Sequence, residues 1–193
     1  MNVNNFLLSP VDLRIVNDWQ LVVDSAEGII EKSKTNYTEI KPYGHSTFYH
    51  LGQLGSVGHH HISDNWHNVH ILPSPWTKKY LPWLGQLLND MKELGPTYAI
   101  SIMRGNGAEH TDYNTYPCAL NYPMTTTDAY TYIKYEGQEH GYPSLIDEPW
   151  ILATGYPHGV RNIGLRTVFN LHFTVDYPTV LRWFDKHPNL IYN

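Results

Sequence analysis

The chain has 193 residues, close to the roughly 150 typical of one domain, so the sequence predicts a single compact unit over residues 1–193. Charged residues make up 16% and aromatic residues 13%, a composition that excludes a disordered or coiled-coil chain. With 13 Lys plus Arg against 18 Asp plus Glu, the charge disfavours a broad basic surface for nucleic acid, although a local contact stays open. The longest apolar run, Trp150 to Ala153, is too short to span a bilayer. The N-terminus lacks a secretory pattern and Cys118 has no partner, so we expect a cytoplasmic protein with this cysteine buried and inert.

Three segments have the spacing of amphipathic helices. Apolar residues recur at three- and four-residue steps from Asp18 to Lys34, where Asp18 is the expected N-cap. A second helix is predicted from Pro75 to Leu94, because its Trp, Tyr, Leu and Met residues share one face, and Gly95 and Pro96 follow it. We expect its aromatic residues Trp76, Tyr80 and Trp83 to pack in the core. A terminal helix is predicted over Thr179–Lys186, after Pro178.

Short strand-like runs dominate the rest of the chain. A strand pair is predicted within Thr38–Leu51, and the histidine-rich stretch after it is interpreted as a loop. Beyond Pro96, turn residues separate runs at Tyr98–Met103, Cys118–Met124, Tyr130–Tyr135, Trp150–Thr154 and Leu165–Thr174. Several short strands alongside helices predict an α+β protein built on a sandwich or barrel.

A His-x-Asp motif at His110 and Asp112 is the first sign of chemistry. If the motif lies on a strand, side chains two residues apart point to the same side, so both would face one site. Imidazole and carboxylate together suit Fe(II), Mn or Zn, and a third ligand is expected from a distant strand. His158, which follows a Gly-Tyr-Pro turn before the last strand, is the candidate.

The last predicted strand carries a polar face. Leu165, Phe169, Leu171 and Phe173 alternate with Arg166, Asn170 and His172. An arginine on an inward polar face calls for a carboxylate or phosphate partner. Arg161 competes for this role, but strand parity favours Arg166. His172 is interpreted as a core histidine, since six strand residues separate it from Arg166 by about 20 Å.

The ordered pattern His110-Thr111-Asp112, His158 and Arg166 resembles the iron(II)- and 2-oxoglutarate-dependent oxygenases, in particular their prolyl-hydroxylase-like and aspartyl/asparaginyl-hydroxylase-like branches. Segments that resemble small bacterial and phage-borne members are Ala119 to Met124, the PHGVRN stretch at 157–162 and the LRTVFNLHF strand at 165–173. The resemblance covers about Tyr98 to Phe173. Residues 1–95 match nothing in this family.

The resemblance implies a double-stranded β-helix, also called a jelly roll or cupin-like fold, over residues 96–176. Residues 1–95 would pack on it and 177–193 would form a C-terminal helix and tail. It implies Fe(II) held by His110, Asp112 and His158, with 2-oxoglutarate bound to the metal and its distal carboxylate paired with Arg166. Asn121 could add a hydrogen bond to this cosubstrate. The implied reaction consumes O2, releases succinate and CO2, and hydroxylates a small molecule, an amino-acid side chain or a peptide.

Two other function classes remain open at this point. A cupin-type isomerase or lyase would use the same scaffold and metal without 2-oxoglutarate, and a non-catalytic jelly-roll module would need neither. The histidines His59, His60, His61, His67 and His70 suggest a second metal site, but a solvated polar loop near the pocket mouth is favoured, because consecutive residues rarely bind one ion. The substrate and the oligomeric state are left undetermined.

Overall fold

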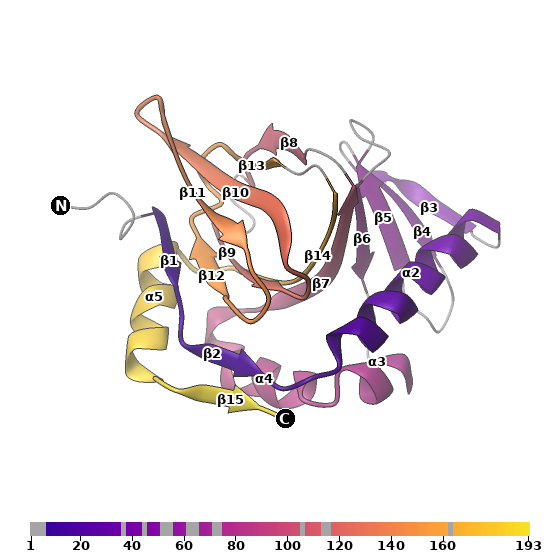
Figure 1. Cartoon of the computed structure of the whole chain (residues 1–193), viewed down its shortest axis with the longest axis horizontal. Helices are drawn as coiled ribbons and strands as arrows, with labels where there is room; N and C mark the ends of the chain where they lie inside the picture. The colour runs from indigo at the N-terminus through magenta and orange to yellow at the C-terminus, as the bar shows by residue number, and fades with distance from the viewer. Residues whose placement is uncertain are drawn as a thin grey trace.

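Two antiparallel sheets that face each other form the centre of the molecule (Figure 1). The structure is a computed structural model that describes residues 7–35, 38–43, 46–50, 56–60, 66–70, 75–104, 107–112, 117–161 and 164–193. The large sheet has the strand order β1 (Leu8–Pro10), β12 (Trp150–Leu152), β9 (Cys118–Pro123), β14 (Leu165–Phe173), β7 (Thr97–Arg104), β6 (Trp66–His70), β5 (Ser56–His60), β4 (Ser46–His50) and β3 (Thr38–Tyr43). The small sheet has the order β11 (Gln138–Ser144), β10 (Thr127–Tyr135), β13 (His158–Arg161) and β8 (Gly107–His110). This is the double-stranded β-helix that the family resemblance implies.

Helices cover the outer side of the large sheet. They are α2 (Trp19–Thr35), α3 (Pro75–Tyr80), α4 (Leu84–Asp90), the 3₁₀ helix η2 (Lys92–Leu94) and α5 (Tyr177–Lys186). A parallel pair of short strands, β15 (Leu190–Tyr192) and β2 (Leu13–Ile15), joins the C-terminal segment to the N-terminal one. None of the described helices is long and apolar enough to cross a membrane.

Strand β14 separates the core from the interior between the sheets. Phe169, Leu171 and Phe173 are fully buried in the cluster formed with the helices, where the ring of Trp83 meets that of Phe169 edge to face with 5.2 Å between centroids. The alternate residues, with Arg166 among them, face the small sheet. The period-two pattern of this strand is therefore confirmed, because the fold needs one apolar and one polar face here.

The first helix and the last helix form where the sequence predicts them. Asp18 accepts a hydrogen bond from the backbone N–H of Leu21 (3.1 Å), and Asp176 accepts one from Thr179 (3.0 Å), so both helices have a side-chain N-cap. Cys118 is buried, as expected.

The helix predicted from Pro75 to Leu94 is broken, which corrects the prediction. Helix α3 ends at Tyr80 and α4 begins at Leu84. Pro82 lies between them, and a proline lacks the N–H that a continuous helix would use and restricts the residue before it. The aromatic face is nevertheless largely buried, since Trp76 and Trp83 are 8% and 2% exposed.

The loop interpretation of the histidine-rich stretch is wrong over two segments. Residues 56–60 form β5 and residues 66–70 form β6, which continue the large sheet from β7. Their sequences are too polar to signal strands, and their pairing partners define them instead. The strand pair within Thr38–Leu51 is confirmed as β3 and β4.

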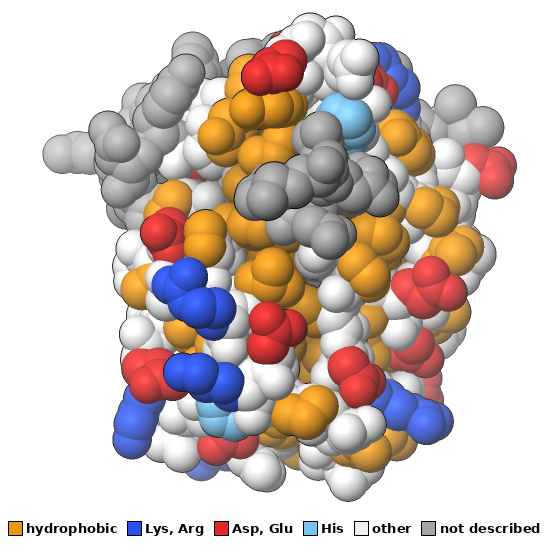
Figure 2. Space-filling view, turned by 90° about the vertical axis from the view of Figure 1, so that its left-hand side faces the viewer, with side chains coloured by type: hydrophobic (Ala, Val, Ile, Leu, Met, Phe, Trp, Pro, Cys, Tyr) orange, Lys and Arg blue, Asp and Glu red, His pale blue; other side chains and the backbone are white. Residues whose placement is uncertain are grey.

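One face of the molecule shows how its charges are spread. In Figure 2, which views the side with β1 and α5, Lys and Arg side chains are interspersed with Asp and Glu, and a band of hydrophobic side chains runs between them. No single-sign basic patch dominates the described side chains of this face, in keeping with the net charge of −5.

Candidate metal centre

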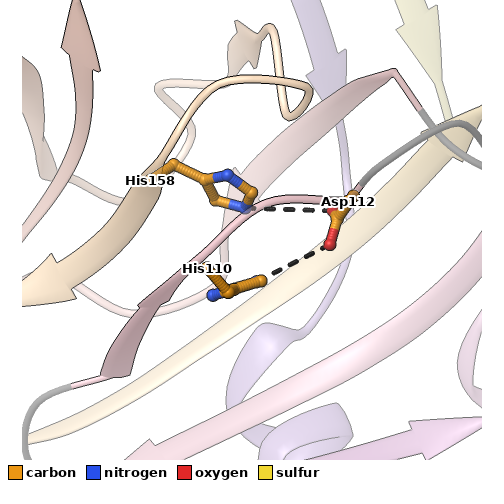
Figure 3. Close-up of side chains that lie close together, drawn as sticks. All are labelled: His110, Asp112 and His158. Carbon is orange, nitrogen blue, oxygen red and sulfur yellow. Dashed lines mark ion pairs between the residues drawn. The ribbon is translucent and has the colours of Figure 1, made fainter. Parts of the chain in front are cut away.

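His110, Asp112 and His158 come together between the sheets (Figure 3). Nε2 of His110 lies 3.7 Å from Oδ1 of Asp112, and Nε2 of His158 lies 3.8 Å from Oδ2 of the same carboxylate. One ligand atom from each residue lies within 4.8 Å of the others. Ligand atoms about 2.1 Å from a first-row metal lie roughly 3 Å apart, so small side-chain rotations would close this group around an ion.

Strand pairing brings the two histidines together. His110 is the last residue of β8 and pairs directly with His158 on β13, so the imidazole rings lie side by side with centroids 4.3 Å apart. Directly opposite residues on antiparallel strands point to the same face. The two histidines are 48 residues apart in the sequence (158 minus 110), and only the sheet makes them neighbours.

Asp112 reaches the site from outside the strand, which corrects the expectation that the His-x-Asp motif lies on one strand. Strand β8 ends at His110, and Asp112 follows in the loop. Its backbone N–H donates to the carbonyl of Thr154 (2.9 Å). This hydrogen bond, rather than the strand period, fixes the backbone from which the carboxylate reaches the two rings.

A backbone hydrogen bond defines the protonation of His158. Its Nδ1 lies 2.9 Å from the carbonyl of Tyr156, which can only accept, so Nδ1 carries the proton and Nε2 keeps its lone pair toward Asp112. Burial, together with the neighbouring His110, lowers the pKa of His158 from 6.5 to about 4. The ring is therefore neutral at neutral pH, the state in which a histidine binds a metal.

The three side chains line a cavity of about 230 Å³ between the sheets. Both sheets contribute walls, and polar groups converge on a partly apolar interior. From the large sheet come Ser101, Met103, Ala119, Asn121, Leu152, Arg166, Asn170 and His172, and from the small sheet Gly107, Thr131, Gly159 and Val160.

Arg166 is a buried cation without an anionic partner among the described residues. Its side chain is 3% exposed, and its single described hydrogen bond runs from a terminal nitrogen to Oγ1 of Thr131 (3.0 Å). Its Nε has no partner at all in the described part of the chain. Burial lowers the pKa of this guanidinium, the direction expected when nothing nearby compensates the charge.

Asn121 lines the same cavity beside Tyr142. Its side-chain amide lies 2.7 Å from the hydroxyl of Tyr142, and that ring stacks on Trp150 with centroids 4.7 Å apart. Burial raises the pKa of Tyr142, so the hydroxyl keeps its proton. Asn121 from the large sheet and Thr131 from the small sheet thus line the cavity of Arg166 with neutral polar groups, and Tyr142 on the small sheet bonds to Asn121.

The remaining candidates, Arg161 and His172, lie outside the group of three ligands. Arg161 is exposed, and its guanidinium pairs through two nitrogens with the carboxylate of Glu139, at 3.1 and 2.6 Å. It is therefore occupied on the outer face of the small sheet. His172 is half-buried rather than fully buried and lines the cavity, and it does not join the His110, Asp112 and His158 group, as expected of a histidine that is not a metal ligand.

The side chains of the histidines considered for a second metal site lie outside what the structure describes. His61 lies outside the described residues, as do the side chains of His59, His60, His67 and His70.

Sequence reasoning missed four groups around the site. They are Thr131, Tyr142 and the backbone carbonyls of Thr154 and Tyr156. The sequence could have indicated Thr131, because it lies two residues before Ile133 in a predicted strand and therefore shares the face of that apolar residue. The sequence could not have indicated the two carbonyls, because every residue has a backbone carbonyl.

Comparison with known proteins finds solved structures that resemble this fold. No protein-family model and no curated protein sequence matches the chain. A prolyl hydroxylase from Trichoplax adhaerens, solved in complex with a hypoxia inducible factor oxygen degradation domain peptide fragment, superposes with a TM-score of 0.60. The match covers 89% of this chain and 84% of that one, at 9% sequence identity. The two proteins share a fold.

Two further solved structures match with TM-scores below 0.5. A Pseudomonas putida prolyl-4-hydroxylase matches with a TM-score of 0.46 at 14% identity, covering 88% of this chain and 94% of that one. A non-haem α-ketoglutarate-dependent carbocyclase from nogalamycin biosynthesis matches with a TM-score of 0.48 at 9% identity, covering 88% and 80%. At these identities the function has to be argued from the side chains in the site.

Proposed function

We propose that the protein is an Fe(II)- and 2-oxoglutarate-dependent oxygenase. The observation that carries the proposal is the buried guanidinium of Arg166, which has no anionic partner among the described residues and lies in the same cavity as His110, Asp112 and His158. A buried charge without a partner is costly, so a site that keeps one is built to receive an anion. An organic acid that carries one carboxylate to Arg166 and binds the metal with its other end would satisfy both features.

The donor set of this chain fits Fe(II). Two imidazoles and one carboxylate are the donor set typical of non-haem Fe(II) oxygenases, so His110, Asp112 and His158 would hold the ion. A three-residue donor set would leave room for a cosubstrate to bind the metal as well. When bound, the iron would supply the redox chemistry that couples decarboxylation of 2-oxoglutarate to succinate and CO2 with hydroxylation of a substrate.

The residues of the chain position these groups and exclude water. His158 presents an unprotonated Nε2 because its Nδ1 proton is held by the carbonyl of Tyr156. Arg166 and Thr131 offer donors to the distal carboxylate of the cosubstrate. Asn121, which is held against Tyr142, is placed to add a hydrogen bond. None of these groups has to transfer a proton for the cosubstrate to bind.

The proposed substrate class is broader than the proposed cosubstrate. The cavity of about 230 Å³ suits the cosubstrate and one protruding group of a substrate, since sites for whole drug-sized ligands are usually 300 Å³ or more. The matched prolyl hydroxylase was solved with a peptide. We therefore propose a small molecule, an amino-acid side chain or a peptide as the substrate.

An anaerobic titration tests the proposal. Metal-free protein is loaded with Fe(II) and then with 2-oxoglutarate, and the visible charge-transfer absorption of the chelate is recorded. We expect the band in the parent, its loss in His158→Ala, and at least a 10-fold weaker 2-oxoglutarate affinity in Arg166→Ala. Arg161→Ala is the matched control, because this arginine pairs with Glu139 outside the cavity. It should bind 2-oxoglutarate like the parent.

The other outcomes are informative. Tight metal binding without the band would contradict the oxygenase and point to a metal enzyme of the cupin type. Equal effects of Arg161→Ala and Arg166→Ala would contradict the role of Arg166. Absence of metal binding in the parent would leave a non-catalytic module.

A further inference from the structure

One short turn holds two of the three candidate metal ligands. The turn comprises residues 153–157, between β12 and β13. The carbonyl of Thr154 accepts from the backbone N–H of Asp112 (2.9 Å), and the carbonyl of Tyr156 accepts from Nδ1 of His158 (2.9 Å). Two acceptors, two residues apart, thus hold the backbone of Asp112 and orient the imidazole of His158. A displacement of this turn would disturb both ligands at once.

The turn is held by backbone hydrogen bonds at its ends. The N–H of Ala153 donates to the carbonyl of Leu7 (2.7 Å), and the carbonyl of Pro157 accepts from the N–H of Lys134 (2.7 Å). Within the turn, the N–H of Tyr156 donates to Ala153 (3.2 Å). A methyl group added at Gly155 would touch nothing within 4 Å, so side-chain packing does not hold the turn at that residue.

A side-chain contact braces the exposed part of the turn. The ring of Tyr156 meets the ring of Tyr135 edge to face, with 5.7 Å between centroids and an interplanar angle of 74°. Tyr135 lies at the end of β10, one residue after the Lys134 N–H that binds Pro157. Edge-to-face pairs stabilise beyond the area they bury. Tyr156 is 41% exposed, so this large ring is not simply part of the core.

We propose that Tyr156, braced by Tyr135, is a positioning residue for the metal centre. The inference rests on the metal site of the proposed function. The Tyr156 ring fixes the turn, the turn fixes the carbonyls at 154 and 156, and these fix Asp112 and His158. Groups that orient metal ligands commonly change metal affinity by 10- to 100-fold when removed. Tyr156 acts one step further out, which places its effect at the lower end of that range.

Metal affinity measured with Co(II) tests the proposal without relying on activity. Tyr156→Ala and Tyr135→Ala should each weaken Co(II) binding roughly 10-fold and change the visible d–d absorption that reports coordination geometry. Tyr156→Phe keeps the ring and should restore parent affinity to within about 2-fold. Tyr80→Ala is the matched control, because it removes a tyrosine ring from an aromatic pair with Trp76 (4.8 Å) on α3, outside the cavity lining.

Hydrogen exchange of the Asp112 amide provides a second readout in metal-free protein. This N–H is held by the turn, so it should exchange faster in Tyr156→Ala than in Tyr156→Phe or Tyr80→Ala. Parent-like Co(II) affinity in both alanine variants of the Tyr135–Tyr156 pair would overturn the proposal. If the parent binds no metal, the proposed function fails, and the amide exchange rate alone then decides whether Tyr156 positions the turn.

Discussion

At the scale of single residues, Arg166 shows a conflict between stability and function. The guanidinium is buried with one hydrogen bond to Thr131 and no described anion. The folded protein therefore carries the cost of a desolvated charge until an acid binds. Functional sites often retain such unfavourable features because the ligand compensates them.

Replacement of this charge should stabilise the empty protein. Arg166→Met keeps most of the side-chain volume and removes the desolvated charge, so we expect the free energy of unfolding without ligands to rise by about 1 kcal/mol. Urea denaturation measures this change. The same variant should lose the stabilisation that 2-oxoglutarate gives the metal-loaded parent. A less stable empty variant would show that Arg166 is satisfied by contacts other than those described.

His158 makes the stability of metal-free protein depend on pH. Its pKa is lowered in the fold to about 4 from 6.5, so the unfolded chain takes up a proton first as the pH falls. Stability is then lost between about pH 6.5 and 4, by about 2 kcal/mol from pH 7 to pH 5 for this group alone. Denaturation of the parent and of His158→Gln at both values isolates the contribution. The variant should lose about 2 kcal/mol less, and an equal loss would contradict the assignment.

At the scale of elements, a hydrogen-bond junction joins the N-terminal segment to the large sheet. The carboxylate of Asp147 accepts from the hydroxyl of Tyr122 (2.9 Å) and from the indole N–H of Trp19 at the start of α2 (3.2 Å). The same hydroxyl accepts from the backbone N–H of Ile15 (2.9 Å), at the end of β2. Asp147 itself has a φ of 61°, a left-handed conformation that asparagine and aspartate tolerate better than other non-glycine residues.

The junction makes a prediction about substitutions at Asp147. Alanine removes the oxygen that accepts both hydrogen bonds, leaves the proton of the buried Tyr122 hydroxyl without an acceptor, and disfavours the positive φ, so Asp147→Ala should cost about 2 kcal/mol of unfolding free energy. Asn keeps an acceptor and tolerates this backbone conformation, so Asp147→Asn should cost less than half as much. Thermal and urea denaturation of the two variants test the order. Equal losses would show that charge, rather than geometry, matters here.

At the scale of the whole molecule, metal binding should be coupled to folding. His110 and His158 are neighbours only when β8 and β13 pair, so the unfolded chain offers no comparable site. A divalent ion at 100 times its Kd should raise the free energy of unfolding by about 2.7 kcal/mol. Calorimetry with and without Co(II) measures the shift, and Asp112→Ala should abolish it. A parent whose melting temperature does not change with metal would contradict the site.

Much of the architecture could be predicted because it depends on local periodicity. The amphipathic spacing of α2, its Asp18 cap and the two faces of β14 are consequences of 3.6- and 2-residue repeats. The same reasoning placed Arg166 on an interior polar face before any contact was known. The apolar pattern predicted one continuous helix across Pro82, where this single proline breaks it. The patterns also did not predict the strands β5, β6, β11 and β13, because these strands are short or polar.

The sequence by itself determined which residue types were available and which faces they occupied: a His-x-Asp motif, a later histidine and an inward arginine, each on its own segment. Only the tertiary structure decided that His110 and His158 lie opposite each other on paired strands, that Asp112 is held by the carbonyl of Thr154, and that Arg166 shares their cavity with no anionic side chain of the described residues beside it. The physical reason is that side-chain periodicity acts within a few residues of the chain. Strand register and turn hydrogen bonds join segments that are tens of residues apart, and no local pattern encodes which ones will pair.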